Sequence, residues 1–122
     1  MQNLDQHMQR AVTLHQQGHL TQAEALYRQA LQHHPTHHGI LNLLGTLCAE
    51  QEHYAQGIDY LRQAIAHAPK PESYMFNLGE ALCRHQQFAE GVVQFEKLLS
   101  TPQANKAHYA LAKAYQHLQN YE

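Results

Sequence analysis

Histidine is the residue whose number and spacing in this chain could most readily support chemistry. Twelve of the 122 residues are histidine, and four of them lie in the segment HHPTHH, from His33 to His38. Imidazole is a common metal ligand and titrates near neutral pH, so this segment suggests a metal site or a pH-sensitive switch. A polar turn between two helices would explain the same residues without any chemistry. The choice depends on the elements around the segment.

Other residue types give little support for catalysis. Cys48 and Cys83 lie 35 residues apart without a CxxC motif, which is neither a disulfide framework nor a zinc pattern and favours a reducing compartment. The chain has no Gly-rich phosphate loop, no HExxH and no G-x-S-x-G. We therefore expect no enzyme activity, no catalytic residue, no resident metal and no cofactor.

Composition narrows the class of protein and the class of partner. Hydrophobic residues make up 43% of the chain, charged residues 15%, and the net charge is −2 with neutral histidines. Without a basic stripe to neutralise phosphates, nucleic acid is not an expected partner. No window approaches the roughly 18 apolar residues of a membrane span, and the N-terminus lacks the apolar segment of a signal peptide. We expect a cytoplasmic protein that does not bind membranes.

A period of 34 residues runs through the sequence. Pro35 is followed by Pro69 at this interval, and the pair Leu44-Gly45 recurs as Leu78-Gly79. Further equivalent sets are Leu20, Tyr54 and Phe88; Tyr27, Leu61 and Phe95; Ala23, Gly57 and Gly91; and Leu14, Cys48 and Leu82. The spacing then slips by one residue, because Leu111-Ala112 follows 33 residues after Leu78-Gly79. Apolar residues within each period recur at steps of three and four, which predicts helices and no strands.

Small residues within these helices predict that the helices pair closely. Glycine inside a helix costs roughly 0.5–1 kcal/mol relative to alanine, so Gly45 and Gly57 indicate that two backbones must approach each other. Each pair would leave an apolar face that only the next pair can bury, which predicts a stack. Three helix starts are also indicated: one by a capping box at Thr21 and Glu24, and two by first-turn prolines at Pro71 and Pro102.

These residues resemble the tetratricopeptide repeat, most clearly in LLGTLCAEQEHYAQGIDYLRQAIAHAP, from Leu43 to Pro69. The resemblance implies an all-α fold, a right-handed α-solenoid of antiparallel helix pairs with about three and a half repeats. We expect one domain, 1–122, with repeats near 4–37, 38–71, 72–104 and a partial repeat at 105–122. The first repeat departs most from the pattern, with Arg10-Ala11 where Leu-Gly is usual. Within this frame HHPTHH is the turn between two repeats, and we expect it to be solvated rather than metal-binding.

The resemblance also implies where a partner would bind. The first helix of each pair lines a concave groove in this family, and such grooves bind a peptide or a helix of another protein. The candidate groove residues are Met8, Val12, Asn42, Leu43, Thr46, Phe76, Asn77, Glu80, Arg84, Tyr109 and Lys113. Met8, Leu43, Phe76 and Tyr109 would form an apolar stripe between polar groups, unless some of them belong to the core.

Two known binding modes of the family find no match here. One subset clamps the C-terminal carboxylate of heat-shock chaperones with Lys and Asn. The corresponding positions of this chain hold Met8, Val12, Leu43, Ser73 and Asn77. The protein-glycosylating transferases carry a ladder of groove asparagines. Asn77 alone matches that ladder, because Leu43 and Ala110 interrupt it.

The sequence ends at LQNYE, within a fourth repeat whose second helix is missing. Tyr115 and Tyr121 match positions that would pack against that helix. The expected function is a scaffold that binds a protein or peptide in its groove. Two alternatives remain: a non-catalytic N-terminal docking arm of a larger glycosyl- or methyltransferase, and a unit that self-associates as a homo-oligomer through its C-terminal end.

Overall fold

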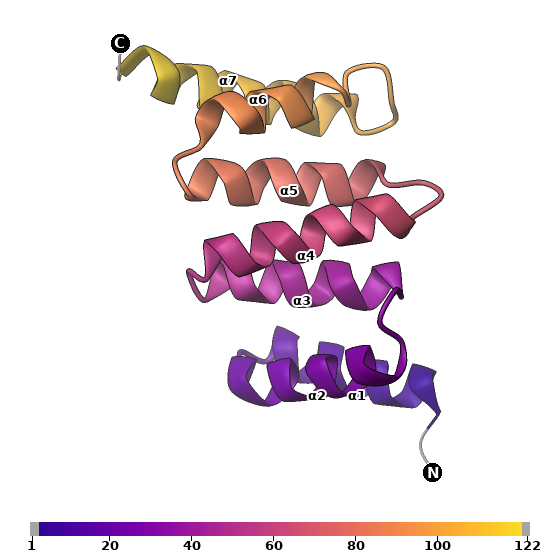
Figure 1. Ribbon diagram of the computed structural model, residues 1–122. Helices are drawn as coiled ribbons and strands as arrows, with labels where there is room; N and C mark the ends of the chain where they lie inside the picture. The colour runs from indigo at the N-terminus through magenta and orange to yellow at the C-terminus, as the bar shows by residue number, and fades with distance from the viewer. Residues whose placement is uncertain (1–2, 121–122) are drawn as a thin grey trace.

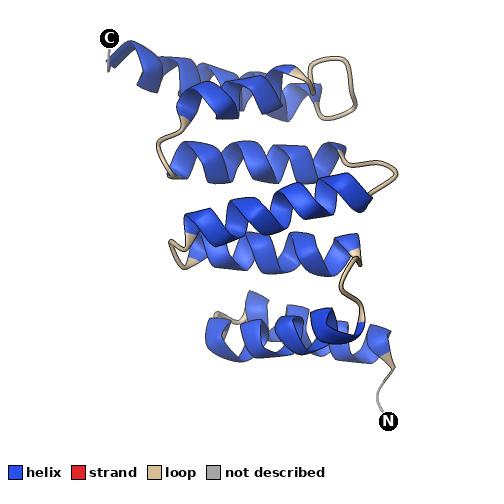
Figure 2. Cartoon of the chain, in the orientation of Figure 1, coloured by secondary structure: helices blue, strands red, loops and turns tan. Residues whose placement is uncertain are grey.

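The computed structural model describes residues 3–120 as a stack of α-helices, with no strand in that range (Figures 1 and 2). The helices are α1 (Leu4–Gln16), α2 (Leu20–His33), α3 (His38–Glu50), α4 (Tyr54–His67), α5 (Glu72–Arg84), α6 (Phe88–Glu96) and α7 (Ala104–Asn120). The first six form three antiparallel pairs, and α7 packs on the last pair. The predicted all-α solenoid is confirmed.

Glycines bring the two helices of a pair into close contact, as the sequence predicts. A Cβ atom on Gly57 would lie 2.7 Å from the carbonyl oxygen of Gly45, closer than real Cβ atoms come. In the next pair, a Cβ atom on Gly79 would lie 2.5 Å from the ring of Phe95. The absence of a side chain therefore lets α3 touch α4 through their backbones, and lets the ring of Phe95 lie directly beneath α5.

Large apolar residues fill the space around these contacts. Tyr27, Leu61 and Phe95 occupy equivalent positions of the second helices, and all three are buried. The core consists of three clusters along the stack, centred on α1–α3, on α3–α5 and on α5–α7. Each cluster draws residues from successive helix pairs, so every pair is stabilised by its neighbour.

The slip in the period lies in the loop between α6 and α7. The helix α6 has only 9 residues, against 14 in α2 and in α4. The chain after it stays anchored because Leu98 is fully buried and Thr101 donates its hydroxyl to the carbonyl of Leu98 at 2.6 Å. The altered connection shifts α7 by one residue without breaking the stack.

The predicted helix starts are wrong by one or two residues. The helix α2 begins at Leu20 and its N-cap is His19, so Thr21 lies inside the helix and the predicted capping box does not form. Pro71 is the N-cap of α5 rather than a first-turn residue, and Pro102 lies in the turn before α7. The turn geometry set by Gly18, with φ of +84°, brings the chain into α2 two residues earlier than the capping box predicts.

The turn inside each pair repeats this backbone conformation. Glu52 and Gln86 stand 34 and 68 residues after Gly18 and also have positive φ values, 65° and 64°. Side chains rarely adopt this left-handed region, so the repeat imposes strain on two residues that a glycine would avoid.

The two ends of the stack differ in character. On α1, the exposed residues Arg10 and Thr13 occupy the positions where α3 carries the buried Leu44 and Leu47. On α7, Tyr115 is 44% exposed. Tyr121 lies outside the described residues. None of the helices in residues 3–120 is long and apolar enough to cross a membrane.

Candidate functional site: pockets between the first helices

The segment HHPTHH forms the turn between α2 and α3, and two of its four histidines make hydrogen bonds that stabilise the helices around it. The Nδ1 atom of His37 accepts the backbone N–H of Ile40 and so caps α3, at 3.3 Å. The ring of His38 is hydrogen-bonded through Nδ1 to the hydroxyl of Tyr74 on α5, at 2.9 Å. Among residues 3–120, no group of three or more His, Cys, Asp or Glu side chains could hold a metal ion.

The helices α1, α3, α5 and α7 form one face of the stack, which we call the groove face. Three equivalent junctions occur along it, between α1 and α3, between α3 and α5, and between α5 and α7. At each junction the floor is a residue of the intervening second helix: Tyr27, Leu61 or Phe95. The side chains above this floor decide whether the junction is filled or open.

The first junction is filled by His15. Its Nδ1 atom lies 2.9 Å from the hydroxyl of Tyr27 and its Nε2 atom lies 2.9 Å from Oε2 of Glu50. A neutral ring protonated at Nε2 satisfies both contacts, because it accepts the Tyr27 O–H and donates to the carboxylate. Burial, together with the nearby carboxylate of Glu50, raises the pKa of Tyr27 to about 12. The phenol is therefore a neutral hydrogen-bond donor within this network at physiological pH.

The second junction is an open pocket of about 180 Å³, which we call the central pocket. Ala49 stands where His15 stands in the first junction, so the space that an imidazole ring fills there is open here. The rim is polar and carries two carboxylates and one guanidinium. The lining residues are Thr46, Ala49, Glu50, Leu61, Asn77, Glu80, Ala81 and Arg84.

The third junction is a larger pocket of about 420 Å³, which we call the C-terminal pocket. Cys83 takes the place of His15 here, and Ala110 takes the place of Asn77. The additional lining residues include the aromatic Phe88 and Phe95 and the cationic Arg84 and Lys113. Burial raises the pKa of the Cys83 thiol, so this side chain is a neutral part of the pocket wall.

The predicted groove residues are distributed along this face. Thr46, Asn77, Glu80 and Arg84 line the central pocket, and Glu80, Arg84 and Lys113 line the C-terminal pocket. Asn77 donates its side-chain N–H to Oδ1 of Asn42 at 2.9 Å, which joins α5 to α3. The predicted apolar stripe is not uniform: Met8, Val12 and Leu43 pack against the first core cluster and Phe76 against the third, while Tyr109 is 71% exposed.

Sequence reasoning missed the floor of the pockets and the role of His15. Leu61 and Phe95 belong to a repeated apolar series, and each also lines one of the pockets. The signal was present in the alignment of the repeats. His15, Ala49 and Cys83 form a 34-residue series whose members differ widely in size, so an opening at the second and third junctions could have been inferred.

A larger hollow of about 630 Å³ lies elsewhere, inside the first helix pair. Leu4 and His7 of α1 face Leu26 and His33 of α2 there. The Nε2–H of His7 donates to the carbonyl of Leu26 at 2.7 Å, so its polar group is already satisfied. His7 stands where the equivalent residue of the second pair is the buried Leu41, which explains the looser packing.

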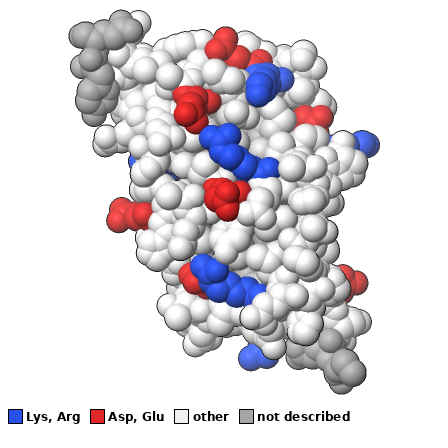
Figure 3. Space-filling view, in the orientation of Figure 1, with Lys and Arg blue, Asp and Glu red and all other residues white. Residues whose placement is uncertain are grey.

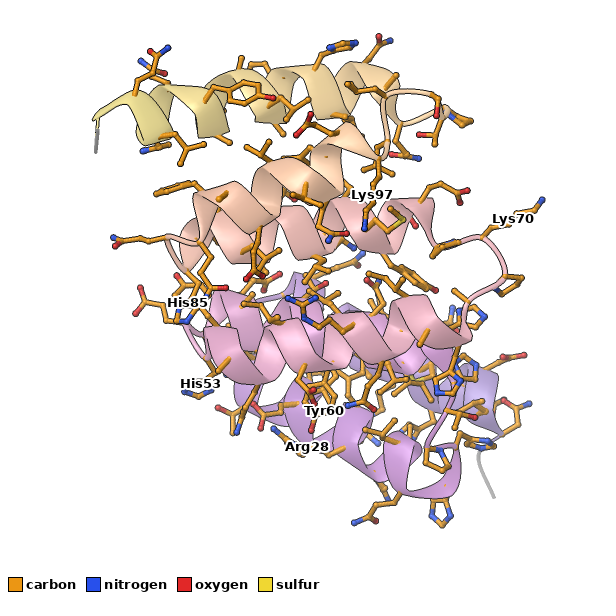
Figure 4. All side chains as sticks on the ribbon, turned by 45° about the horizontal axis from the view of Figure 1, so that its top comes forward. Arg28, His53, Tyr60, Lys70, His85 and Lys97 are labelled. Carbon is orange, nitrogen blue, oxygen red and sulfur yellow. The ribbon has the colours of Figure 1, made fainter. Side chains whose placement is uncertain are left out.

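On the face formed by α2, α4 and α6, positively and negatively charged side chains lie next to each other (Figure 3). Arg28 donates to Glu24 at 2.8 Å and to the hydroxyl of Tyr60 at 2.9 Å, and Figure 4 shows Arg28 and Tyr60 beside each other between α2 and α4. Arg62 pairs with Glu90 at 3.0 Å. These contacts tie successive second helices together.

The fold and its repeated junctions define a helical repeat protein of the α-solenoid class. The family model for the tetratricopeptide repeat matches residues 14–82, more than half of the chain. The chain belongs to the tetratricopeptide repeat family. A comparison with curated proteins returned no match.

Solved structures give the same fold. A structure of MamA AMB-1 is 21% identical with a TM-score of 0.84, covering 96% of this chain and 70% of that one. An O-GlcNAc transferase mutant from Thermobaculum terrenum is 28% identical with a TM-score of 0.82, and the match covers 93% of this chain but 23% of the transferase. A tetratricopeptide repeat protein from Parabacteroides merdae is 19% identical with a TM-score of 0.75, covering 90% and 44% of the two chains.

Membership of this family supports a role in protein–protein interaction, because tetratricopeptide repeats generally mediate such contacts and are typically non-catalytic.

Proposed function

We propose that this chain is a protein-interaction module that binds a segment of a partner protein along the groove face. The observation that carries the proposal is the pair of open pockets at successive junctions of α3, α5 and α7. Neighbouring first helices in a packed stack are about 10 Å apart, and an extended chain spans that distance in about three residues. A partner segment in extended conformation can therefore place one side chain in each pocket.

The polar groups around the pockets fit a peptide better than a small metabolite. Thr46 bonds to its own helix through the carbonyl of Asn42, and the amides of Asn42 and Asn77 bond each other. The second side-chain N–H of Asn77 remains in position to meet a backbone carbonyl of a bound chain. In this proposal the pockets bind side chains of the partner, and the amides fix the position of the partner's backbone along the groove face.

The groove proposal is tested by photo-crosslinking in cells that make the protein. A photoreactive phenylalanine analogue replaces Glu80, which is exposed on α5, or Gln63, which is exposed on α4 at the opposite face. We expect a discrete adduct with a partner protein from position 80 and none from position 63. Adducts that form from position 63 and not from position 80 would place the partner on the other face and refute the proposal.

A second candidate, a docking arm of a larger transferase, is favoured by the similarity to the Thermobaculum terrenum O-GlcNAc transferase. In that case the groove face would bind the protein that the enzyme modifies. An immunoblot of source cells tests this candidate, because a transferase would run far above the 14.0 kDa of this chain. A band near 14.0 kDa would contradict it and leave the stand-alone module.

A third candidate is self-association through α7, where Tyr109 and Tyr115 are exposed. Size-exclusion chromatography with light scattering tests it. A mass that stays at one chain up to high concentration would remove this candidate.

A further inference from the structure

We propose that the C-terminal pocket is an anchor site for a large apolar or aromatic side chain, and that the partner segment around this side chain is acidic. The inference rests on the proposed binding at the groove face and names the chemistry of the partner.

The pocket has the size and floor of an anchor site because of three small residues. Ala110, Ala114 and Gly79 surround the ring of Phe95, and the missing side chain of Gly79 allows this ring to lie under α5, 5.5 Å from the ring of Phe76. Phe95 itself is only 1% exposed, so a bound side chain would pack mainly on the partly exposed Phe88 and Ala110, which line the pocket beside it. Aromatic and large apolar side chains bury large apolar areas in such pockets.

The equivalent central pocket cannot take the same side chain. Its floor is Leu61 rather than an aromatic ring, Asn77 stands where the C-terminal pocket has Ala110, and its volume is less than half as large. The first junction is filled by His15 altogether. The groove face therefore has one anchor site for a large apolar side chain, within the part of the chain that the structure describes.

The charges beside this pocket select an acidic segment. Arg84 and Lys113 lie on its rim, and Lys106 lies one turn before Ala110 on α7. No ion pair within residues 3–120 involves any of these three cations, whereas Arg28 and Arg62 on the other face are paired. Lys106 and Lys113 instead lie 5.5 Å from the ring centres of Phe76 and Tyr109. Glu80 is the single carboxylate on the rim.

Three unpaired cations in a chain of net charge −2 form a local positive region beside an apolar pocket. A carboxylate of the partner, placed next to its anchor side chain, would meet this region and gain both affinity and register. Single-stranded nucleic acid also combines rings with negative charge. The net charge of −2 and the 8 Lys and Arg residues against 10 Asp and Glu disfavour that polymer, so the segment is assigned as peptide.

Random heptapeptides displayed on phage provide the probe. Selection against the purified chain should enrich peptides in which an aromatic residue or leucine lies within two residues of Asp or Glu. The selected peptide is then made with a fluorescent label, and its Kd is measured by anisotropy for the wild-type chain and three variants. Circular dichroism checks that each variant is folded.

Two variants alter the pocket and one serves as a matched control. Arg84→Glu/Lys113→Glu reverses the rim charge, and Ala110→Leu fills part of the pocket. The control, Arg62→Glu/Lys97→Glu, changes the net charge by the same amount on α4 and just after α6. We expect each pocket variant to weaken binding by about tenfold or more and the control to leave it within about twofold.

The outcomes separate the inference from the groove proposal. Enriched peptides that are basic or lack a large apolar residue, but still lose binding in Arg84→Glu/Lys113→Glu, would overturn the inference and leave the groove. Peptides that bind all variants equally would overturn both. A selection that enriches nothing overturns the inference. So would an oligothymidine of twelve nucleotides that displaced the labelled peptide, because nucleic acid would then be the occupant.

Discussion

At the scale of single residues, the backbone conformation of the turn inside each helix pair is the clearest source of strain. Gly18 adopts positive φ without a penalty, whereas Glu52 and Gln86 carry side chains in the same conformation. A residue with a side chain loses roughly 1–2 kcal/mol of stability in the left-handed region. Replacing it by glycine removes this strain, but the greater conformational freedom of glycine in the unfolded chain offsets part of the gain.

We therefore predict that Glu52→Gly and Gln86→Gly each stabilise the protein by about 0.5–1 kcal/mol. Gly18→Ala should destabilise it by about 1 kcal/mol for the same reason. Urea unfolding followed by circular dichroism measures the free energy of unfolding. Ala25→Gly, at an exposed position within α2, is the control and should destabilise. Loss of stability in both turn variants would contradict the account of strain.

The buried phenol of Tyr27 causes the stability of the fold to fall at alkaline pH. Its pKa is about 12 in the folded chain against an ordinary value of 10.0. Because the raised pKa favours the neutral phenol, this contribution to stability is complete below pH 10 and is lost as the pH rises from about 10 to 12. Tyr27→Phe removes the ionisable group.

We predict that the urea midpoint of the wild-type chain falls more steeply between about pH 10 and pH 12 than that of Tyr27→Phe. At pH 7 the same substitution should lower the free energy of unfolding by about 1 kcal/mol, because His15 loses the hydrogen bond that it accepts from the Tyr27 hydroxyl. Tyr109→Phe removes an exposed hydroxyl and serves as the control. Parallel pH profiles for the wild-type chain and Tyr27→Phe would show that burial of this phenol has no part in alkaline unfolding.

At the scale of elements, the distance between paired helices depends on single glycines. A methyl group at Gly57 would meet the backbone of α3, which cannot move aside as a side chain can. At Gly39, by contrast, the nearest atoms belong to the ring of His37, at 3.1 Å. The two positions therefore separate the cost of crowding from the gain in helix propensity.

We predict that Gly57→Ala destabilises the chain by about 1–3 kcal/mol, the usual cost of overpacking, despite the better helix propensity of alanine. Gly39→Ala should leave the free energy of unfolding unchanged or raise it slightly. Thermal melting of both variants provides the comparison. A stable Gly57→Ala would mean that α3 and α4 can separate without loss, contrary to the packing observed.

The sequence predicted the elements well because their determinants repeat. The faces that pack together are set by the paired glycines and by the large residues Tyr27, Leu61 and Phe95. Equivalent positions recur in three repeats, so the same packing is indicated three times. The start of α2 was predicted wrongly because the turn at Gly18 outweighs the capping preference of Thr21. The pockets were not predicted, because they depend on how far His15, Ala49 and Cys83 reach across a junction, which requires the geometry of three helices.

At the scale of the whole molecule, each pair is stabilised by its neighbours, so the middle of the stack should be the most stable part. The helix α3 has the most buried residues among those described and contacts α2, α4 and α5. The helix α7 packs on one side only, against α5 and α6. Stability in such arrays is close to a sum over neighbouring contacts.

Hydrogen exchange measured by mass spectrometry should therefore show slowest exchange in α3 and α4 and faster exchange in α1 and α7. The ordering should persist in low concentrations of urea, where terminal helices open first. Uniform protection from α1 to α7 would indicate that the chain unfolds as one unit, or that another molecule covers α7.

Binding of a partner segment at the pockets of the groove face should change the backbone amide chemical shifts of the residues that line them. We would measure these shifts by adding the selected heptapeptide to isotopically labelled protein. We predict that the largest changes lie on α5 and α7, around Glu80, Arg84 and Lys113, with smaller changes on α3. Changes confined to α2, α4 and α6 would contradict this prediction, because the peptide would then bind the opposite face of the stack.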